Sequence, residues 1–249
     1  MIKLSAVMIV KNESAVISRC LEAISWVDEI VALDTGSEDN TPQICQSYGA
    51  KVFHLTKWQG FGKARQEAVS LASNDWVFSV DADEVVSPQL KQSLLTLCGA
   101  GEGKYAYRIK VQSYYLGKKI RFCGWQNEWH LRVFNRQKGT FSNAVVHESV
   151  VTNQALGKLA GVLHHYTYPT MEVHHNKMKL YGDLGAKKMY DRGKKSNALK
   201  ALLRGGFTFV KMYIFKLGFL DGREGFLLCQ TTAWGTWYKY RQLAKLCAS

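Results

Sequence analysis

Short apolar runs and amphipathic segments follow one another in a regular order through about the first eighty residues. The apolar runs are typical of buried β-strands, and they lie at Leu4–Val10, Glu29–Leu33, Lys51–Leu55 and Trp76–Val80. The segments between them carry helical spacing or helix-start residues, and they lie at 14–24, 41–49 and 63–73, with Ser14 as the expected first cap. This alternation predicts an α/β fold with a wound, mostly parallel sheet flanked by helices.

The pattern changes after residue 104. Residues 105–112 alternate between apolar and polar positions, as in a half-exposed strand. Residues 122–134 are dense in aromatic and polar side chains, which suits a sugar-binding site and suits an ordinary domain interface equally well. Residues 171–195 predict a basic helix, and residues 196–246 are rich in Phe, Leu, Trp and Tyr.

The last fifty residues raise the possibility of a membrane contact. Their longest stretch without charge, residues 225–238, has 14 residues, and a bilayer span needs roughly 18–20. Lys200, Arg204 and Lys211 are expected on one helical face, with Phe and Leu elsewhere. This arrangement suits a helix lying in a membrane interface. It also suits a helix that covers the sheet and shows a basic edge to solvent.

Composition and charge limit the number of domains, the state of the cysteines and the kind of partner. The 249 residues allow one large domain or two small ones, and the six cysteines contain no Cys-x-x-Cys pair. Without a recognisable secretory signal, the cysteines are expected to be reduced thiols in the cytoplasm. Residues 1–100 hold 8 Lys and Arg against 12 Asp and Glu, whereas residues 101–249 hold 25 against 8. The basic half is therefore expected to meet an anionic partner: nucleic acid, a membrane surface, or a phosphorylated lipid or sugar.

Polar side chains follow three of the four predicted strands. They are Lys11-Asn12-Glu13, then Asp34, then Asp81 and Asp83. Ligands bind at the carboxyl ends of strands in open α/β sheets, and paired carboxylates suit a divalent cation that also takes phosphate oxygens. The alternative is that Asp81 and Asp83 are ordinary surface acids in a loop. The buried run before them and the Ser87-Pro88 helix start after them favour a site.

Two further motifs admit both a structural and a chemical interpretation. Gly60-Phe61-Gly62 resembles half of a dinucleotide fingerprint, but it follows the third strand and lacks the third glycine, which excludes a Rossmann dehydrogenase. Either the loop is merely flexible, or Lys63 or Arg65 reaches the ligand site from the helix start. The His164-His165 and His174-His175 pairs lack companion cysteines at zinc spacing. One of these histidines could still join a metal at Asp83 or contact a phosphate.

Three ordered motifs at residues 4–13, 34–41 and 80–84 resemble those of glycosyltransferase family 2, which has the GT-A fold. The second half is similar to lipopolysaccharide inner-core β-1,4-glucosyltransferases, through residues 132–136, 146–148, 165–168 and 218–222. The resemblance implies an inverting, metal-dependent transferase that moves a sugar, glucose by expectation, from a UDP-sugar to a heptose of the inner core.

The resemblance also implies roles for individual residues. Those expected to bind the donor are Lys11, Glu13, Asp34, Arg65, Asp81 and Ala82. Asp83, with Asp81, is expected to bind the divalent metal, Mn²⁺ or Mg²⁺. Family members carry a Glu-Asp pair whose Asp is the base, but here the pair is His147-Glu148. We therefore expect Glu148 to be the catalytic base, with Glu128 as the second candidate.

The resemblance divides the chain by function and places it in the cell. Residues 1–103 are expected to bind the nucleotide-sugar and residues 104–170 the acceptor, while residues 171–249 form a helical, basic region that associates with a membrane. The expected partners are a UDP-sugar, a lipid-linked core oligosaccharide and the anionic inner membrane surface, with no nucleic acid. The protein is expected to be cytoplasmic and peripheral on the inner face of the membrane.

Two other functions fit parts of the sequence. A sugar-phosphate nucleotidyltransferase also uses a wound sheet and a metal, but Lys11-Asn12-Glu13 stands where its glycine-rich phosphate loop would be. A non-enzymatic protein that binds RNA or membrane would use the basic half. The strand-end acids disfavour contact with a phosphate backbone, and no RNA-binding motif is present.

Overall fold

The computed structural model describes residues 1–101, 103, 105–126, 128–143 and 148–248. The chain forms two compact units. Unit 1 contains Met1–Val111 and Asn127–His165, and unit 2 contains Gln112–Gln126 and Tyr166–Ser249. The division of the chain by function at residues 103 and 170 stays a prediction.

A mixed sheet forms the centre of unit 1. Its strands include β1 (Leu4–Val10), β2 (Glu29–Asp34), β3 (Lys51–His54), β4 (Trp76–Ser79), β5 (Glu84–Val86), β6 (Tyr105–Tyr115), β8 (Glu128–Asn135) and β11 (Ala155–Tyr168). Among the described residues the order is β3-β2-β1-β4-β8-β6-β11-β5. β3, β2, β1 and β4 are parallel, whereas β8 runs antiparallel to β4. The predicted α/β class, with its wound parallel sheet, is confirmed.

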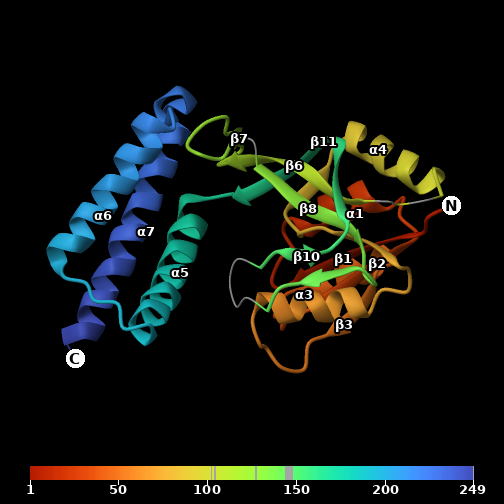
Figure 1. The fold of residues 1–249 in the computed structure, drawn as a ribbon, viewed down its shortest axis with the longest axis horizontal. Helices are drawn as coiled ribbons and strands as arrows, with labels where there is room; N and C mark the ends of the chain where they lie inside the picture. The colour runs from red at the N-terminus through yellow and green to blue at the C-terminus, as the bar shows by residue number, and fades with distance from the viewer. Residues whose placement is uncertain (102, 104, 127, 144–147, 249) are drawn as a thin grey trace. The chain divides into compact units, whose positions relative to one another are not determined.

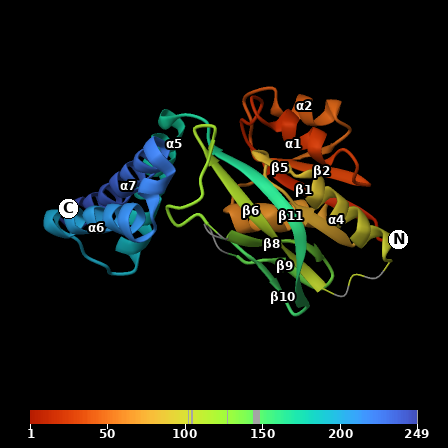
Figure 2. The ribbon, with the colours of Figure 1, turned by 90° about the horizontal axis from the view of Figure 1, so that it is seen from above.

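Strand β1 is buried on both faces of this sheet. Leu4, Ala6, Met8 and Val10 pack in one core cluster with α1 (Ile17–Ile24) and α4 (Pro88–Gly99). Val7 packs in another cluster on the opposite face, which α3 (Phe61–Ser70) covers. The two-residue period of a strand thus sends alternate side chains to different helices. Figure 1 shows the sheet between these helices, and Figure 2 shows α2 (Thr41–Ser47) beside α1.

Several predicted boundaries shift by a few residues. Ser14 does not cap α1, which begins at Ile17 and has no side-chain cap. Helix α3 begins at Phe61 instead of Lys63, directly after Gly60, whose φ of 103° suits glycine. The predicted cap at Ser87 is confirmed, because its side chain accepts a hydrogen bond from the Leu90 N–H. Strands β9 (Gly139–Phe141) and β10 (Val150–Thr152) form a separate antiparallel ladder.

Three long helices dominate unit 2. They are α5 (Met171–Asp191), α6 (Ala198–Val210) and α7 (Gly222–Ala248), with the π-helix η1 (Lys211–Phe215), the 3-10 helix η2 (Gly218–Asp221) and strand β7 (Lys118–Lys119). Helix α7 contacts both α5 and α6, and Figure 2 shows the three side by side. Among the described residues, no helix combines the length and low charge that crossing a bilayer requires. Each cysteine of the chain is a free thiol.

A buried carboxylate ties together three parallel strands at the edge opposite their carboxyl ends. Glu29, at the start of β2, accepts hydrogen bonds from Ser5 Oγ at 2.6 Å and from Ser73 N–H at 2.7 Å, and it pairs with Lys51 at 2.7 Å. Burial alone would raise the pKa of Glu29. The bonds from Lys51, Ser5 and Ser73 outweigh burial and lower this pKa to about 2.

Replacing this carboxylate should destabilise the protein in a pH-dependent way. Because the folded-state pKa of Glu29 is lowered, its stabilising effect is present above about pH 4.5 and is lost as the pH falls toward 2. At pH 7, Glu29→Gln should lower the free energy of unfolding by about 1–3 kcal/mol. Urea unfolding at pH 7 and pH 3 should show this loss shrinking at the lower pH. The exposed Glu67→Gln is the control, and an equal loss at both pH values would contradict the assignment.

Candidate active site

Three parallel strands bring their following residues to one edge of the sheet. Val10 of β1 lies opposite Asp34 of β2, and Val7 lies opposite Ser79 of β4. The residues after Val10, Asp34 and Ser79 therefore enter neighbouring loops at the carboxyl edge. This is the edge where open α/β sheets bind ligands.

Asp34 is oriented by the loop that follows it. Its buried carboxylate accepts hydrogen bonds from the Gly36 and Ser37 N–H groups at 3.1 to 3.3 Å and lies 3.3 Å from His54 Nδ1. Burial raises the pKa of Asp34, but these hydrogen bonds outweigh it and lower the pKa overall. The neighbouring Glu13 N–H donates to Thr41 Oγ1, and Lys11 is exposed. The predicted residues of the first two loops thus share one edge.

Asp81 is held between two arginines. Its Oδ1 accepts from Arg65 Nη2 at 2.6 Å, and its Oδ2 accepts from Arg132 Nη2 at 3.1 Å. Both arginine side chains are only about a tenth exposed. Burial acts to raise the pKa of Asp81, but the two adjacent cations hold it well below its usual range. Asp81 is therefore a fixed negative charge at the end of β4.

Arg65 also connects Asp81 to the predicted catalytic base. Its Nε donates to Glu148 Oε1 at 2.6 Å, and its Nη1 donates to Ser79 Oγ at 3.2 Å. The structure therefore brings Arg65, Asp81 and Glu148 together, although 83 positions separate the two ends of the Arg65–Glu148 contact. Of the two cations that the sequence proposed at this helix start, Arg65 reaches the site.

Sequence reasoning gave no role to two residues of the site, Glu84 and Arg132, although both lie in motifs that it singled out. Glu84 is fully buried, accepts a hydrogen bond from the Asp81 N–H at 2.9 Å and forms an ion pair with Arg132. Burial raises the pKa of Glu84 despite the Arg132 charge. Arg132 lies in β8, directly before the fully buried Val133 and Phe134. A lone cation beside such a run is the signal that could have found it, since a buried charge needs a partner.

Asp83 faces a histidine from a distant strand. His165, in β11, lies with Nε2 3.3 Å from Asp83 Oδ2. Burial lowers the pKa of His165, but the hydrogen bond and charge of Asp83, with the charges of Glu84 and Asp81, raise it overall to about 9. Ala82, between the two aspartates, is buried. The sequence had raised the possibility that one histidine joins Asp83.

The Asp83–His165 pair fits a divalent cation. A carboxylate oxygen and an imidazole nitrogen are both ordinary ligands of such ions, and here they lie 3.3 Å apart. Within the described part of the chain, no group of three or more His, Cys, Asp or Glu side chains could hold a metal. To hold such an ion together with Asp83, His165 would first have to release its Nε2 proton, and water and substrate oxygens would fill the remaining positions.

The second candidate base lies apart from this cluster. Glu128 begins β8, four residues before Arg132, which corresponds to about 13 Å along a strand. Its carboxylate lies 3.8 Å from His130 Nε2. Glu148 is thus the candidate that contacts the Asp81 network. Residues 144–147, which include His147 of the predicted motif, lie outside the described residues.

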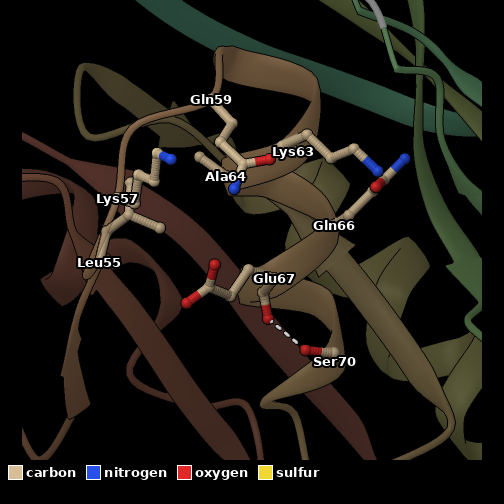
Figure 3. Close-up of a pocket in the computed structure, with 8 residues that line it drawn as sticks. All are labelled: Leu55, Lys57, Gln59, Lys63, Ala64, Gln66, Glu67 and Ser70. Atoms are coloured by element: carbon tan, nitrogen blue, oxygen red, sulfur yellow. Dashed lines mark hydrogen bonds between the residues drawn. The ribbon is translucent and has the colours of Figure 1, made fainter.

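A separate pocket lies on the outer side of α3. It has a volume of about 360 Å³ and is lined by Leu55, Lys57, Gln59, Lys63, Ala64, Gln66, Glu67 and Ser70 (Figure 3). Lys63, Glu67 and Ser70 share one helical face, whereas Arg65 projects from another side of the helix. Lys63 therefore belongs to this pocket, and Arg65 belongs to the site at the sheet edge.

Comparison with known proteins gives consistent matches. A family model described as glycosyl transferase family 2 matches residues 5–156. The lipopolysaccharide core biosynthesis glycosyltransferase LpsC of Rhizobium meliloti is 28% identical, covering 98% of this chain and 91% of that protein. An uncharacterized glycosyltransferase of Rickettsia typhi is 31% identical, covering 90% and 81%. Glucosyl-3-phosphoglycerate synthase from Mycobacterium tuberculosis, solved with Mn²⁺, UDP-glucose and phosphoglyceric acid, is 28% identical over 48% of this chain and 46% of that chain, with a TM-score of 0.35.

Removing the cation of Arg132 should destabilise the fold. Arg132→Met leaves the fully buried Glu84 without its counter-charge, and breaking a buried pair costs about 3–5 kcal/mol. Denaturant unfolding should show this loss. Adding Glu84→Gln should recover part of it, because the uncompensated charge is then gone. The control is Arg108→Met on the exposed side of β6, and a loss no larger than the control's would contradict the buried pair.

Proposed function

Since the chain belongs to glycosyl transferase family 2, we propose that it moves a sugar, with glucose as the expected unit, from a UDP-sugar to a heptose of the lipopolysaccharide inner core. The observation that carries the donor half of this proposal is the polar edge of the sheet. This edge holds three polar features: Asp34, the network that joins Arg65 to Asp81 and Glu148, and the Asp83–His165 pair. The acceptor half is supported by the likeness to LpsC over 98% of the chain.

The donor nucleotide is proposed to lie over the ends of β1 and β2. Glu13 and Asp34 would recognise the uracil and the ribose, with Lys11 and the backbone at Ala82 beside them. A ribose offers hydroxyl donors, and the Asp34 carboxylate is a buried acceptor already oriented by its loop. The orientation exists before the ligand arrives, which lowers the entropy cost of binding.

Glu148 is proposed as the general base of an inverting transfer. The acceptor hydroxyl oxygen attacks the anomeric carbon on the face opposite the diphosphate, and Glu148 takes the hydroxyl proton as the new glycosidic bond forms. The bond from the anomeric carbon to the diphosphate oxygen breaks, and its electron pair leaves with UDP. Arg65 contacts both Glu148 and Asp81, so it would fix the base relative to the donor.

Asp83 and His165 would hold Mn²⁺ or Mg²⁺, with water and diphosphate oxygens as the other ligands. When bound, the ion supplies positive charge that stabilises the departing diphosphate. Asp81 was also predicted as a metal ligand. Because both of its oxygens accept hydrogen bonds from arginine, we propose that Asp81 positions Arg65 and Arg132 beside the donor.

The acceptor is proposed to be lipid-linked, which would place the protein on the cytoplasmic face of the inner membrane as a peripheral protein. Lipopolysaccharide core biosynthesis in the name of LpsC supports this acceptor class. The net charge of +13 supports an anionic membrane surface as the partner. The proposal includes no role in nucleic-acid binding.

Glu148→Gln should separate chemistry from binding. The amide can still accept the hydrogen bond from Arg65, but it cannot take a proton, so turnover should fall about 10²- to 10⁴-fold while the affinity for UDP stays nearly unchanged. Transfer from UDP-glucose to a heptose-containing core acceptor measures the first quantity, and calorimetry with UDP measures the second. Glu128→Gln is the matched control. A near wild-type rate in Glu148→Gln would remove Glu148 from this role.

UDP binding should depend on a divalent cation and on Asp83. Calorimetric titration with UDP in Mn²⁺ should give tighter binding than in EDTA, and Asp83→Ala should lose that difference. Glu38→Gln, an exposed acid of the loop after β2, should retain it. Equal affinity with Mn²⁺ and with EDTA would overturn the metal assignment. Absence of UDP binding under every condition would overturn the donor site.

A further inference from the structure

Unit 2 presents a continuous stripe of large apolar side chains to solvent. The stripe runs along α6 and η1, where the exposed residues recur every three or four positions: Leu199, Leu203, Phe207, Val210, Ile214 and Leu217. Leu203 is 63% exposed and Phe207 is 59% exposed. A regular stripe of this kind marks an interaction surface, whereas scattered exposed apolar residues are ordinary.

The packing of α6 is reversed relative to an ordinary surface helix. Its buried residues are the small Ala201 and Gly205. A Cβ atom at Gly205 would lie 2.8 Å from Trp237 Cβ of α7, so the two helices approach closely through this face. The helix is thus held to α7 by its small side and by Phe209, and the large apolar side chains of the stripe are left for another contact.

The end of η1 and the following η2 add an apolar tip, formed by Phe215, Phe219 and Leu220. Phe215 is 72% exposed and Leu220 is 55% exposed. The turn is fixed by the buried Asp221, whose carboxylate accepts from the Arg121 N–H at 3.0 Å and from the Phe122 N–H at 2.8 Å. These polar contacts fix the backbone next to the tip.

The charged residues around this face favour one kind of binding partner. Residues 192–220 contain seven Lys and Arg and no Asp or Glu. A second copy of the chain would bring the same positive charge, so self-association through this face is electrostatically unfavourable. An anionic lipid surface offers negative charge at the headgroups and apolar chains beneath them, which matches both features of the face.

We infer that the stripe and the tip form a membrane-docking face that inserts in the plane of an anionic phospholipid bilayer. No described helix could cross a bilayer, so the contact lies in the interface. The inference deepens the proposed function and rests on it for the lipid-linked acceptor, which such a face would keep within reach. It does not depend on the identity of the sugar.

The test is sedimentation of the full chain with phosphatidylcholine vesicles, with and without phosphatidylglycerol, at low and high salt. The variant Leu203→Ser, Phe207→Ser, Phe215→Ser should bind anionic vesicles at least about tenfold more weakly. The control carries Leu95→Ser, Val151→Ser and Leu156→Ser, three exposed apolar residues outside the face, and should bind as the wild type does. UDP calorimetry on each protein keeps failure of docking distinct from failure of the donor site.

A second variant tests the contribution of positive charge. It also keeps the inference testable if the serine variant folds poorly, which circular dichroism would reveal. Lys211→Gln with Lys216→Gln keeps the apolar stripe and should weaken binding to anionic vesicles by roughly fivefold per lost charge at low salt. The inference would be overturned if the wild type does not bind vesicles, or if neither variant changes its binding. Equal binding to neutral and anionic vesicles would also overturn it, as would a wild-type dimer that becomes monomeric in the serine variant.

Discussion

The pairing of Asp81 with two arginines is the interaction on which the site depends. Asp81 follows β4, Arg65 comes from α3, and Arg132 comes from β8. Charges removed from water need close counter-charges, so these ion pairs constrain a helix and an antiparallel strand relative to the end of a parallel strand. Glu148 joins through Arg65, and Glu84 joins through Arg132. The same contacts that compensate buried charge therefore also fix the Glu148 carboxylate beside Arg65.

The strands that end at this edge could be predicted because each one shows in the sequence as a short apolar run. The run Leu4–Val10 is apolar except for Ser5, as suits a strand covered on both faces, and β1 has these bounds. Asp34 and Asp81 stand out because each follows such a run. Parallel order then brings their loops together without further information. The sequence alone could thus place Asp34 and Asp81 at one edge of the sheet.

The remaining parts of the site depend on contacts that the sequence does not display. β5 is three residues long and pairs with β11, almost eighty positions later, so its short run carried no strand signal. Arg132 joins Asp81 only because β8 lies antiparallel beside β4, with Phe78 opposite Val133. His165 meets Asp83 through the β5–β11 pairing, in which His165 lies opposite Glu84. Ser14 failed as a helix cap because its loop is tied elsewhere: its N–H donates to Asp39.

The two units differ in where their large apolar side chains lie. In unit 1 large apolar residues such as Leu33, Phe78 and Phe134 fill the core, and the buried Glu84 is paired with Arg132. In unit 2 close approach at glycine replaces much of that volume: a Cβ at Gly225 would lie 2.2 Å from the Gly218 carbonyl oxygen. Helices that pack through small residues release their Leu and Phe to the surface, which costs stability in water. This cost is offset where an apolar environment receives those side chains. Contact with such an environment would explain both the richness of residues 196–246 in large apolar side chains and the packing of α6 through small residues.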